Sequence, residues 1–182
     1  MVSLEQLKAI VPNTSSGRLA LFVEPVNHAV EEFGTKRLAE WLANVAHESG
    51  GFVYTAELWG PTQAQAGYDL RKDLGNTRPE AIEVAKRHGS TPGPFFRGHG
   101  LIQTTGYDNH CEARDKLGID CVENPKLLTE PVNAARSAAM FWRDHGCDDL
   151  PDFEAMVRRV NGGLNGLADR YSYLGRARAA LA

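Results

Sequence analysis

Apolar residues recur at spacings of three and four along most of the chain, which is the pattern of amphipathic helices. The clearest apolar stripe follows Thr35 and consists of Leu38, Trp41, Leu42, Val45 and Ala46. This helix is predicted to run to His47 or Glu48, because Ser49-Gly50-Gly51 then breaks the pattern.

Prolines and glycines mark the ends of further helices. A helix with Pro25 in its first turn is expected to end at Gly34. The same signals predict helices at 79–88, 108–117, 131–145, 152–160 and 167–180. A period-two pattern runs only from Phe52 to Trp59, which is short enough for an extended loop or one strand of a small hairpin.

The length of 182 residues argues for one domain over residues 1–182. Glycine- and proline-rich pieces at 60–67 and 89–100 look like loops around a site, and the segment 60–99 is a candidate for a small lobe. The sequence therefore predicts a mainly α fold with at most a small hairpin.

The composition, with 42% hydrophobic and 24% charged residues, is that of a globular protein. The chain has 20 basic and 23 acidic residues, and its net charge of −3 argues against a nucleic-acid partner. No apolar run approaches the roughly 18 residues of a membrane-spanning helix. The N-terminus also lacks the features of a secretory signal. We therefore expect synthesis in the cytoplasm and no stable membrane insertion.

Three cysteines, Cys111, Cys121 and Cys147, cannot all pair within one chain. Their odd number and the lack of a CxxC spacing favour reduced thiols, with a Cys111–Cys121 disulfide as the alternative. His47-Glu48 does not continue as a zinc-binding HExxH motif, because Gly51 occupies the place of the second histidine. The sequence therefore predicts no metal and no other cofactor.

Glu48 and Glu57 lie on either side of the double glycine. An unbroken helix would place them about 13 Å apart on opposite faces, but a turn at Gly50-Gly51 lets the chain double back. Glu48 is expected to be partly buried, and burial favours the neutral form that a general acid needs. Glycoside hydrolysis uses two such carboxyl groups, and a separation of about 6.5–9.5 Å leaves room for water and predicts inversion. On spacing alone, two surface charges are the simpler explanation.

The segment from Phe95 to His110 reads Phe-Phe-Arg-Gly-His-Gly-Leu-Ile-Gln-Thr-Thr-Gly-Tyr-Asp-Asn-His, a composition that suits a sugar-binding wall. This segment resembles the signature of glycoside hydrolase family 19. Three other segments resemble motifs of the same family in the same order: Ala46–Phe52, Val160–Gly163 and Asp169–Tyr171. The compact chain and the short Glu48-to-Glu57 spacing resemble the bacteriophage endolysin branch.

The resemblance implies a lysozyme-like α-helical fold with a substrate cleft, and an inverting mechanism without a metal. Glu48 matches the general acid, Glu57 the general base, and Thr105 the residue that helps to hold the attacking water. The positions expected to line the substrate groove are Gln103, Asn109, Asn161 and Arg170, and Arg170 is also a candidate for tuning the charge of the two carboxyl groups. Trp59 beside Glu57 and Phe96 in the aromatic pair are further candidates for stacking on sugars.

The glycine-rich segment departs from the family at three positions. The family's Gly-Arg-Gly is Gly98-His99-Gly100 here, and two family tyrosines are replaced by Phe96 and His110. A fixed cation thereby becomes a titratable side chain, so we expect a loosened or pH-sensitive loop.

The function that the resemblance implies is that of an endolysin. We expect it to hydrolyse the β-1,4 bonds between N-acetylmuramic acid and N-acetylglucosamine in peptidoglycan glycan strands. The enzyme would act as a monomer on the cell wall after its release from the host cytoplasm. A chitinase using the same residues is the alternative. A wall-binding module without activity and a zinc or cysteine amidase are the remaining classes.

Overall fold

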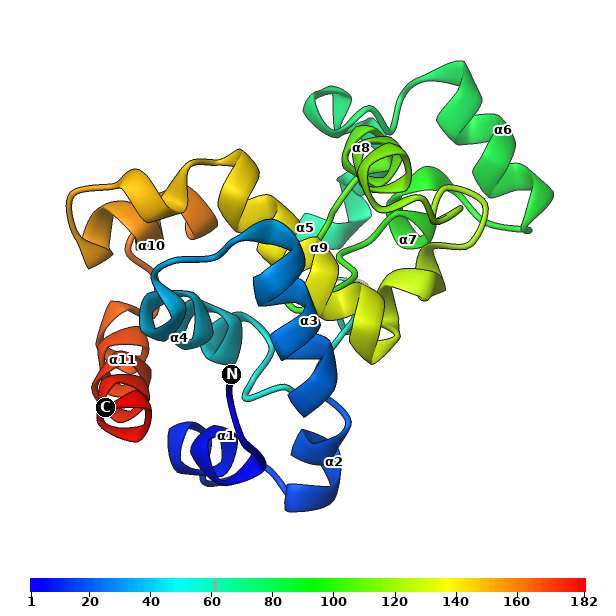
Figure 1. Ribbon diagram of the computed structural model, residues 1–182. Coiled ribbons are helices and arrows are strands. Elements are labelled where there is room, and N and C mark those ends of the chain that lie inside the picture. Colours follow the sequence, from blue (N-terminus) through cyan, green and yellow to red (C-terminus); the bar gives the residue numbers. More distant parts are fainter. Residues whose placement is uncertain (61) are drawn as a thin grey trace.

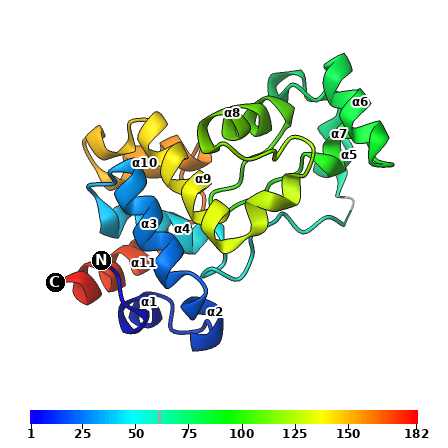
Figure 2. The same cartoon turned by 45° about the vertical axis from the view of Figure 1, so that its right-hand side comes forward.

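The computed structural model describes residues 1–60 and 62–182, and the described chain is built almost entirely of helices and loops (Figures 1 and 2). The α-helices are α1 (Leu4–Ile10), α2 (Ser16–Ala20), α3 (Val23–Phe33), α4 (Leu38–Glu48), α5 (Gln63–Ala66), α6 (Pro79–Arg87), α7 (Pro92–Phe95), α8 (Tyr107–Leu117), α9 (Pro131–Asp144), α10 (Phe153–Asn161) and α11 (Leu167–Leu181). The 3-10 turns are η1 (Tyr68–Leu70), η2 (Lys72–Leu74), η3 (Pro125–Thr129) and η4 (Cys147–Asp149). The prediction of a mainly α fold is confirmed.

Helix ends lie where the sequence signals place them. The five helices predicted beyond residue 78 are all present, each within one residue of its expected bounds. Gly34, Gly118 and Gly162 follow their helices with φ angles of 68°, 68° and 74°, a left-handed conformation that glycine adopts without steric cost. The N-terminal helices α1 and α2 were not predicted, although Ser3 and Gln6 form a capping box at the start of α1.

The main hydrophobic core surrounds α4. This helix packs against α11, while α3 packs against α9 (Figure 1). Trp41 on α4 and Trp142 on α9 are fully buried. Every residue from Glu40 to Ala46 is buried, so α4 is enclosed on all sides and not along one apolar stripe only. Its polar residues therefore need internal partners.

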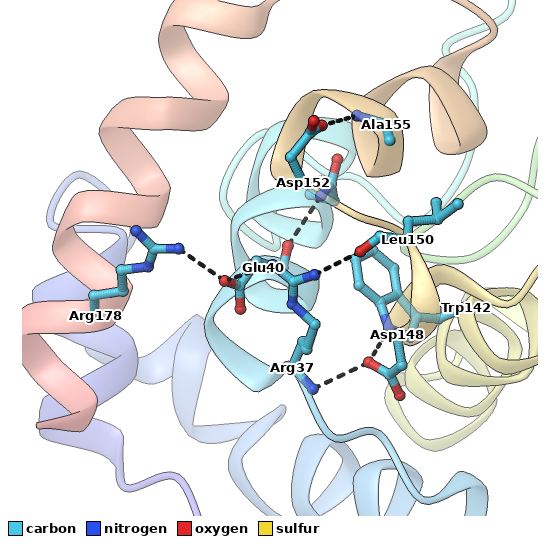
Figure 3. Close-up of polar contacts among 9 residues, drawn as sticks. Arg37, Glu40, Trp142, Asp148, Leu150, Asp152, Ala155 and Arg178 are labelled. Carbon is cyan, nitrogen blue, oxygen red and sulfur yellow. Dashed lines mark hydrogen bonds and ion pairs between the residues drawn. The ribbon is translucent and has the colours of Figure 1, made fainter.

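Glu40 finds these partners at the start of α4 (Figure 3). Its Oε1 accepts hydrogen bonds from Arg178 at 2.9 Å and from Arg37 at 3.4 Å. Burial raises the pKa of Glu40, but donation from Arg178 and the charge of Arg37 outweigh it and leave this pKa lowered. Asp148 accepts from the indole of Trp142 at 2.7 Å and from the backbone of Arg37 at 3.0 Å. These contacts tie α4 to α9, η4 and α11.

A second, smaller core lies in the lobe around α6, α7 and α8. Its buried members are Ala81, Val84, Phe96 and Val122, and Phe95, Tyr107 and Cys111 pack against them. Figure 1 shows α6, α7 and α8 together on the side of the molecule away from α1 and α11. The predicted segment 60–99 thus supplies part of this core, and residues beyond it complete the cluster.

The expectation that Phe96 contacts substrate is wrong. Phe96 is fully buried, and its ring packs edge-on against Phe95 and Tyr107 at centroid distances of 4.8 and 5.3 Å. Adjacent aromatic residues point in different directions, so their pairing in the sequence does not show which of them reaches the surface. Phe96 is a core residue of the small lobe.

The turn after α4 reverses the chain as expected. Gly50, Gly51 and Phe52 have φ angles of 57°, 74° and 68°. A left-handed conformation costs about 1–3 kcal/mol for a residue such as Phe52. Phe52 is fully buried and lies 5.3 Å from the Phe22 ring, and burial of such a side chain contributes about 1.5–3 kcal/mol. Packing thus holds this turn.

The segment after the turn is an extended loop with isolated antiparallel bridges. Ala56 pairs with His99, and His99 pairs with Thr104. The Glu57 backbone donates to the Gly98 carbonyl at 2.8 Å, and the Gly100 backbone donates to the Thr55 carbonyl at 2.8 Å. The period-two pattern therefore marks an extended segment, which brings Glu57 beside the glycine-rich loop.

The cysteines are free, as Cys111, Cys121 and Cys147 form no disulfide. Burial raises the pKa of Cys121 to about 12 and that of Cys147 to about 11. These two thiols are therefore protonated and poorly nucleophilic at neutral pH. No helix in residues 1–60 or 62–182 is long and apolar enough to cross a bilayer.

The position of Phe96 in the small core predicts the effect of its removal. A Phe96→Ala variant is expected to lower the free energy of unfolding by about 3–5 kcal/mol, because it leaves a cavity. Chemical denaturation of this variant and of Trp59→Ala, whose side chain is only partly buried, provides the measurement and its control. Unchanged stability of the Phe96 variant together with weaker substrate binding would restore the groove assignment.

Candidate active site

Glu48 is the last residue of α4, and a buried arginine holds its carboxyl group. Its Oε1 accepts a hydrogen bond from the guanidinium of Arg170 on α11. The same guanidinium donates to Asn44 Oδ1 at 2.7 Å, one helical turn before Glu48. The Glu48 side chain is 23% exposed, whereas that of Arg170 is 1% exposed. The predicted partial burial of Glu48 is confirmed, and one side of its carboxyl group faces solvent.

Arg170 is buried behind Glu48 and bonds its carboxyl group, so its position fits the role beside the carboxyl groups that the resemblance also implied, and not a place in the groove wall. Its Nε donates to the Asn165 carbonyl at 3.3 Å, so three acceptors surround the charge. Such a charge is tolerated in the interior only when it is fully paired. Arg170 acts on the site as a positioning residue for Glu48.

Asn44 is a functional residue that the sequence did not reveal. It is fully buried in the middle of α4, and its Nδ2 donates to the Glu40 carbonyl at 2.9 Å. This bond orients the amide so that Oδ1 faces Arg170. An Asn one turn before a motif glutamate was the available signal, since residues four apart share a helix face.

Glu57 is held by three neutral donors. Its Oε2 accepts from the Gly98 backbone at 3.1 Å. Its Oε1 accepts from the amide of Gln65 at 3.0 Å and from the hydroxyl of Tyr68 at 3.2 Å. Burial and, after it, the charge of Glu57 raise the pKa of Tyr68, which keeps the phenol protonated as a donor. The carboxyl group is partly buried and its orientation is fixed from the small lobe.

Gln65 and Tyr68 were not singled out in the sequence. Gln65 is buried, and it is placed by a capping box with Thr62 at the start of α5. The Thr-x-x-Gln pattern of that box was a usable signal for the helix, although not for the contact with Glu57. Trp59 lies partly buried with its ring 5.6 Å from that of Tyr68.

The loop after Gly100 carries the remaining predicted residues. Asn109 Nδ2 donates to the Thr105 carbonyl at 2.7 Å, which fixes the backbone that presents the partly buried Thr105. Gln103 and Asn109 line one pocket of about 140 Å³ together with residues of α9. A Cβ at Gly98 would lie 2.2 Å from Gln103 Oε1, so only glycine fits between Gln103 and Glu57.

Asn161 stands apart from these contacts as the last residue of α10. Its Nδ2 is buried and has no hydrogen-bond partner within the described part of the chain.

Across residues 1–60 and 62–182, no group of three or more His, Cys, Asp or Glu side chains is arranged to hold a metal.

His99 and His110, two of the three positions that depart from the motif that the segment resembles, form a buried hydrogen-bonded pair. His110 Nδ1 lies 2.8 Å from the Gly106 carbonyl, so it carries the proton, and its Nε2 accepts from His99 Nδ1 at 3.2 Å. Burial, with smaller effects from His110 and Arg97, lowers the pKa of His99 to about 3. Burial lowers the pKa of His110 to about 4. The pair is neutral and ordered, so the expected charge change near neutral pH does not occur in the folded protein.

Comparison with known proteins identifies the chain. No family model matches it. A glycosyl hydrolase family 19 domain-containing protein of Haemophilus influenzae is 31% identical to it over 93% of this chain and 92% of that protein. The chain belongs to glycosyl hydrolase family 19. It is therefore a glycoside hydrolase, and the predicted family is confirmed.

Other relatives of this family 19 hydrolase are chitinases. An endochitinase of Arabidopsis thaliana is 27% identical over 71% of this chain. The match covers 42% of the endochitinase, which is less than half of its length. The structure of chitinase C from Streptomyces griseus matches with a TM-score of 0.73 at 22% identity, covering 99% of this chain and 76% of that one. A class IV chitinase from Zea mays matches with a TM-score of 0.66 at 21% identity, covering 98% and 90%. The predicted lysozyme-like helical fold is confirmed by these structures.

The contact between Tyr68 and Glu57 predicts a loss of turnover when the hydroxyl is removed. Tyr68→Phe is expected to lower kcat about ten- to a hundredfold, since a hydrogen bond to a charged group contributes about 1.5–3 kcal/mol. KM is expected to change little, because the hydroxyl touches the carboxylate and not the sugar. Steady-state kinetics beside Tyr54→Phe, an exposed tyrosine, makes the comparison. A higher KM at unchanged kcat would assign Tyr68 to substrate binding instead.

The buried histidine pair predicts acid sensitivity of stability. Both folded-state pKa values lie below the unfolded value of about 6.5, so the unfolded chain takes up protons first as the pH falls. Stability is then full above about pH 6.5 and declines toward pH 4, by up to about 1.4 kcal/mol per pH unit for each histidine. His99→Gln is expected to flatten this decline in denaturation curves at pH 7, 6 and 5. If the free energy of unfolding declined equally with pH in the parent protein and in His99→Gln, the assignment of His99 as a buried, neutral side chain would be wrong.

Proposed function

We propose that this hydrolase cleaves β-1,4 glycosidic bonds of N-acetylglucosamine-containing glycans in a single displacement between Glu48 and Glu57. The observation that supports it is the way these two carboxyl groups are held. Arg170 fixes Glu48 from the main lobe, which is the part of the molecule built around α4. Three neutral donors fix Glu57 from the small lobe. Both side chains are only partly buried, so each has a face left for substrate or water.

In the proposed reaction, Glu48 carries its proton on Oε2, the oxygen that does not bond Arg170, and donates it to the glycosidic oxygen as the bond from that oxygen to C1 breaks. Glu57 removes a proton from a water that attacks C1 from the opposite face, with Thr105 helping to hold this water. Gln103, whose side chain lies against Gly98 beside Glu57, and Asn109, which shares a pocket with Gln103, bind the sugar. The reaction needs no metal, so chelation by EDTA is expected to leave its rate unchanged.

For the polymer, we propose the glycan strands of peptidoglycan, cleaved between N-acetylmuramic acid and N-acetylglucosamine. The relative matched along nearly its whole length comes from a bacterium, whose wall contains such strands. The short spacing of Glu48 and Glu57 resembles the endolysin branch, and an endolysin would be made in the host cytoplasm and reach the wall after release. It would act as a monomer.

Chitin is the second candidate, and the names of the relatives favour it. The plant relatives and the structural neighbours are chitinases. Chitin has the same β-1,4 bond between N-acetylglucosamine units and lacks the peptide branches of peptidoglycan. The two substrates therefore differ at the substituents and not at the reacting atoms.

Product analysis of a matched variant pair tests this function. Mass spectrometry of purified peptidoglycan after digestion is expected to show fragments with reducing N-acetylmuramic acid ends. Glu48→Gln is expected to lower their rate of release about a hundred- to ten-thousandfold, because it removes the general acid, whereas the exposed Glu31→Gln leaves it unchanged.

The other products discriminate between the alternatives. Reducing N-acetylglucosamine ends would indicate a glucosaminidase, and free peptides would exclude glycoside hydrolysis of this substrate. Turnover of chitin oligomers without turnover of peptidoglycan would establish the second candidate. Retention of most activity in Glu48→Gln would remove Glu48 from the reaction.

A further inference from the structure

A second cavity lies behind the loop that holds Glu57. It has a volume of about 560 Å³ and is bordered by α7, the end of α6 and the start of η3. Neither Glu48 nor Glu57 lines it. The side chains that matter for its chemistry are His88, Phe95, Arg97, His99, Glu123 and Lys126.

The cavity has an excess of positive charge. Glu123 is already compensated, because Arg87 donates to one of its oxygens and His88 lies 3.2 Å from the other. Arg97 is not compensated in this way. Its Nε is buried without a hydrogen-bond partner in the described chain, and its Nη1 has only a long contact of 3.4 Å to the Pro94 carbonyl. Lys126 adds a second, exposed cation.

The other walls supply an acceptor and an aromatic face. His99 is 2% exposed and donates through Nδ1 to His110, so its Nε2 is the ring nitrogen left to accept a hydrogen bond. The positive charges of Arg97 and Lys126 act on this ring and, after burial and His110, lower the pKa of His99. The ring of Phe95 stacks on that of His88, with centroids 4.9 Å apart and an interplanar angle of 21°.

These groups suit a ligand with three parts. The two cations match a carboxylate, the His99 acceptor matches a peptide N–H group, and the flat aromatic wall matches an aliphatic chain. An unbranched chain of N-acetylglucosamine carries no charge and would leave Arg97 unmatched. We infer that this cavity binds the acidic peptide stem that branches from peptidoglycan glycan strands. The inference rests on the proposed function, since it assigns a specificity site to the same enzyme.

The backbone links this cavity to the active site. Arg97 and His99 flank Gly98, whose N–H donates to Glu57 at 3.1 Å. A peptide bound to the two flanking side chains thus also fixes the donor that orients Glu57. Binding of the branch and correct placement of Glu57 are therefore mechanically connected.

Kinetics on three substrates test the site. The substrates are intact peptidoglycan, the same glycan after removal of its peptides by an amidase, and a chitin hexamer. Lys126→Glu is expected to lower kcat/KM on intact peptidoglycan about three- to tenfold, as expected for reversing one exposed ion pair, and to leave kcat/KM on the two substrates without peptides unchanged. Lys86→Glu, the same charge change at an exposed position of α6 outside the cavity, is the control and is expected to change none of the three rates. Equal losses on all three substrates, or no loss on intact peptidoglycan, would overturn the proposal.

A binding measurement separates this site from the proposed reaction. Glu48→Gln protein is titrated with the free stem tripeptide L-alanyl-γ-D-glutamyl-diaminopimelate and followed by NMR of the Arg97 and His99 side chains. Both signals are expected to shift, and the shifts are expected to weaken when Lys126→Glu is added. Peptide binding in an enzyme that does not cleave peptidoglycan would support the cavity and refute the proposed reaction. Cleavage of peptidoglycan without peptide binding would refute the cavity and leave the reaction standing.

Discussion

The buried guanidinium of Arg170 is the contact on which the geometry of the active site depends. It lies on α11 where this helix packs against α4, and it bonds both Asn44 and Glu48. Breaking such a buried ion pair costs about 3–5 kcal/mol, because loss of Glu48 leaves the guanidinium with only the neutral acceptors of Asn44 and Asn165. The packing of the two helices and the direction of the Glu48 carboxyl group are therefore set by the same side chain.

The two carboxyl groups are held by different chemistry. Glu48 has a cation behind it, which is part of the main core. Glu57 has a backbone amide, a side-chain amide and a phenol, which all come from the small lobe or its loop. Three neutral donors fix the orientation of a carboxylate without placing another formal charge beside the sugar. Because each lobe holds one carboxyl group, the relative placement of the two hydrophobic cores determines the distance between them.

The sequence predicted those parts of the structure that local signals control. Pro79 and Pro131 at helix starts, and Gly34, Gly118 and Gly162 after helix ends, gave helix bounds within about one residue, because caps act over a single turn. The motif glutamates were found by resemblance and spacing. Contacts made through tertiary packing were not found. Gln65 and Tyr68 reach Glu57 only once the small lobe has folded.

Burial was the main source of wrong expectations. The resemblance places Phe96 and Arg170 in the groove, and both are buried. For Arg170 it also implies a role beside the carboxyl groups, and Arg170 does bond Glu48. His99 was expected to respond to pH near neutrality, whereas burial beside His110 lowers its pKa to about 3. Motifs identify the residues of a site, but the sequence does not show which of them face the ligand and which support their neighbours from behind.

The proposed function requires Glu48 and Glu57 to act together in one displacement. The stereochemistry of the first product tests this most directly, because a single displacement inverts the anomeric carbon and a covalent intermediate retains its configuration. Proton NMR of a chitin oligomer or a soluble peptidoglycan fragment, recorded within the first minutes of cleavage, gives the configuration at the new reducing end. A single displacement at a β-1,4 bond gives the α-anomer, which then mutarotates. An initial β-anomer would contradict the single displacement and would indicate a double displacement, with either an enzyme group or the sugar's own N-acetyl group as the nucleophile.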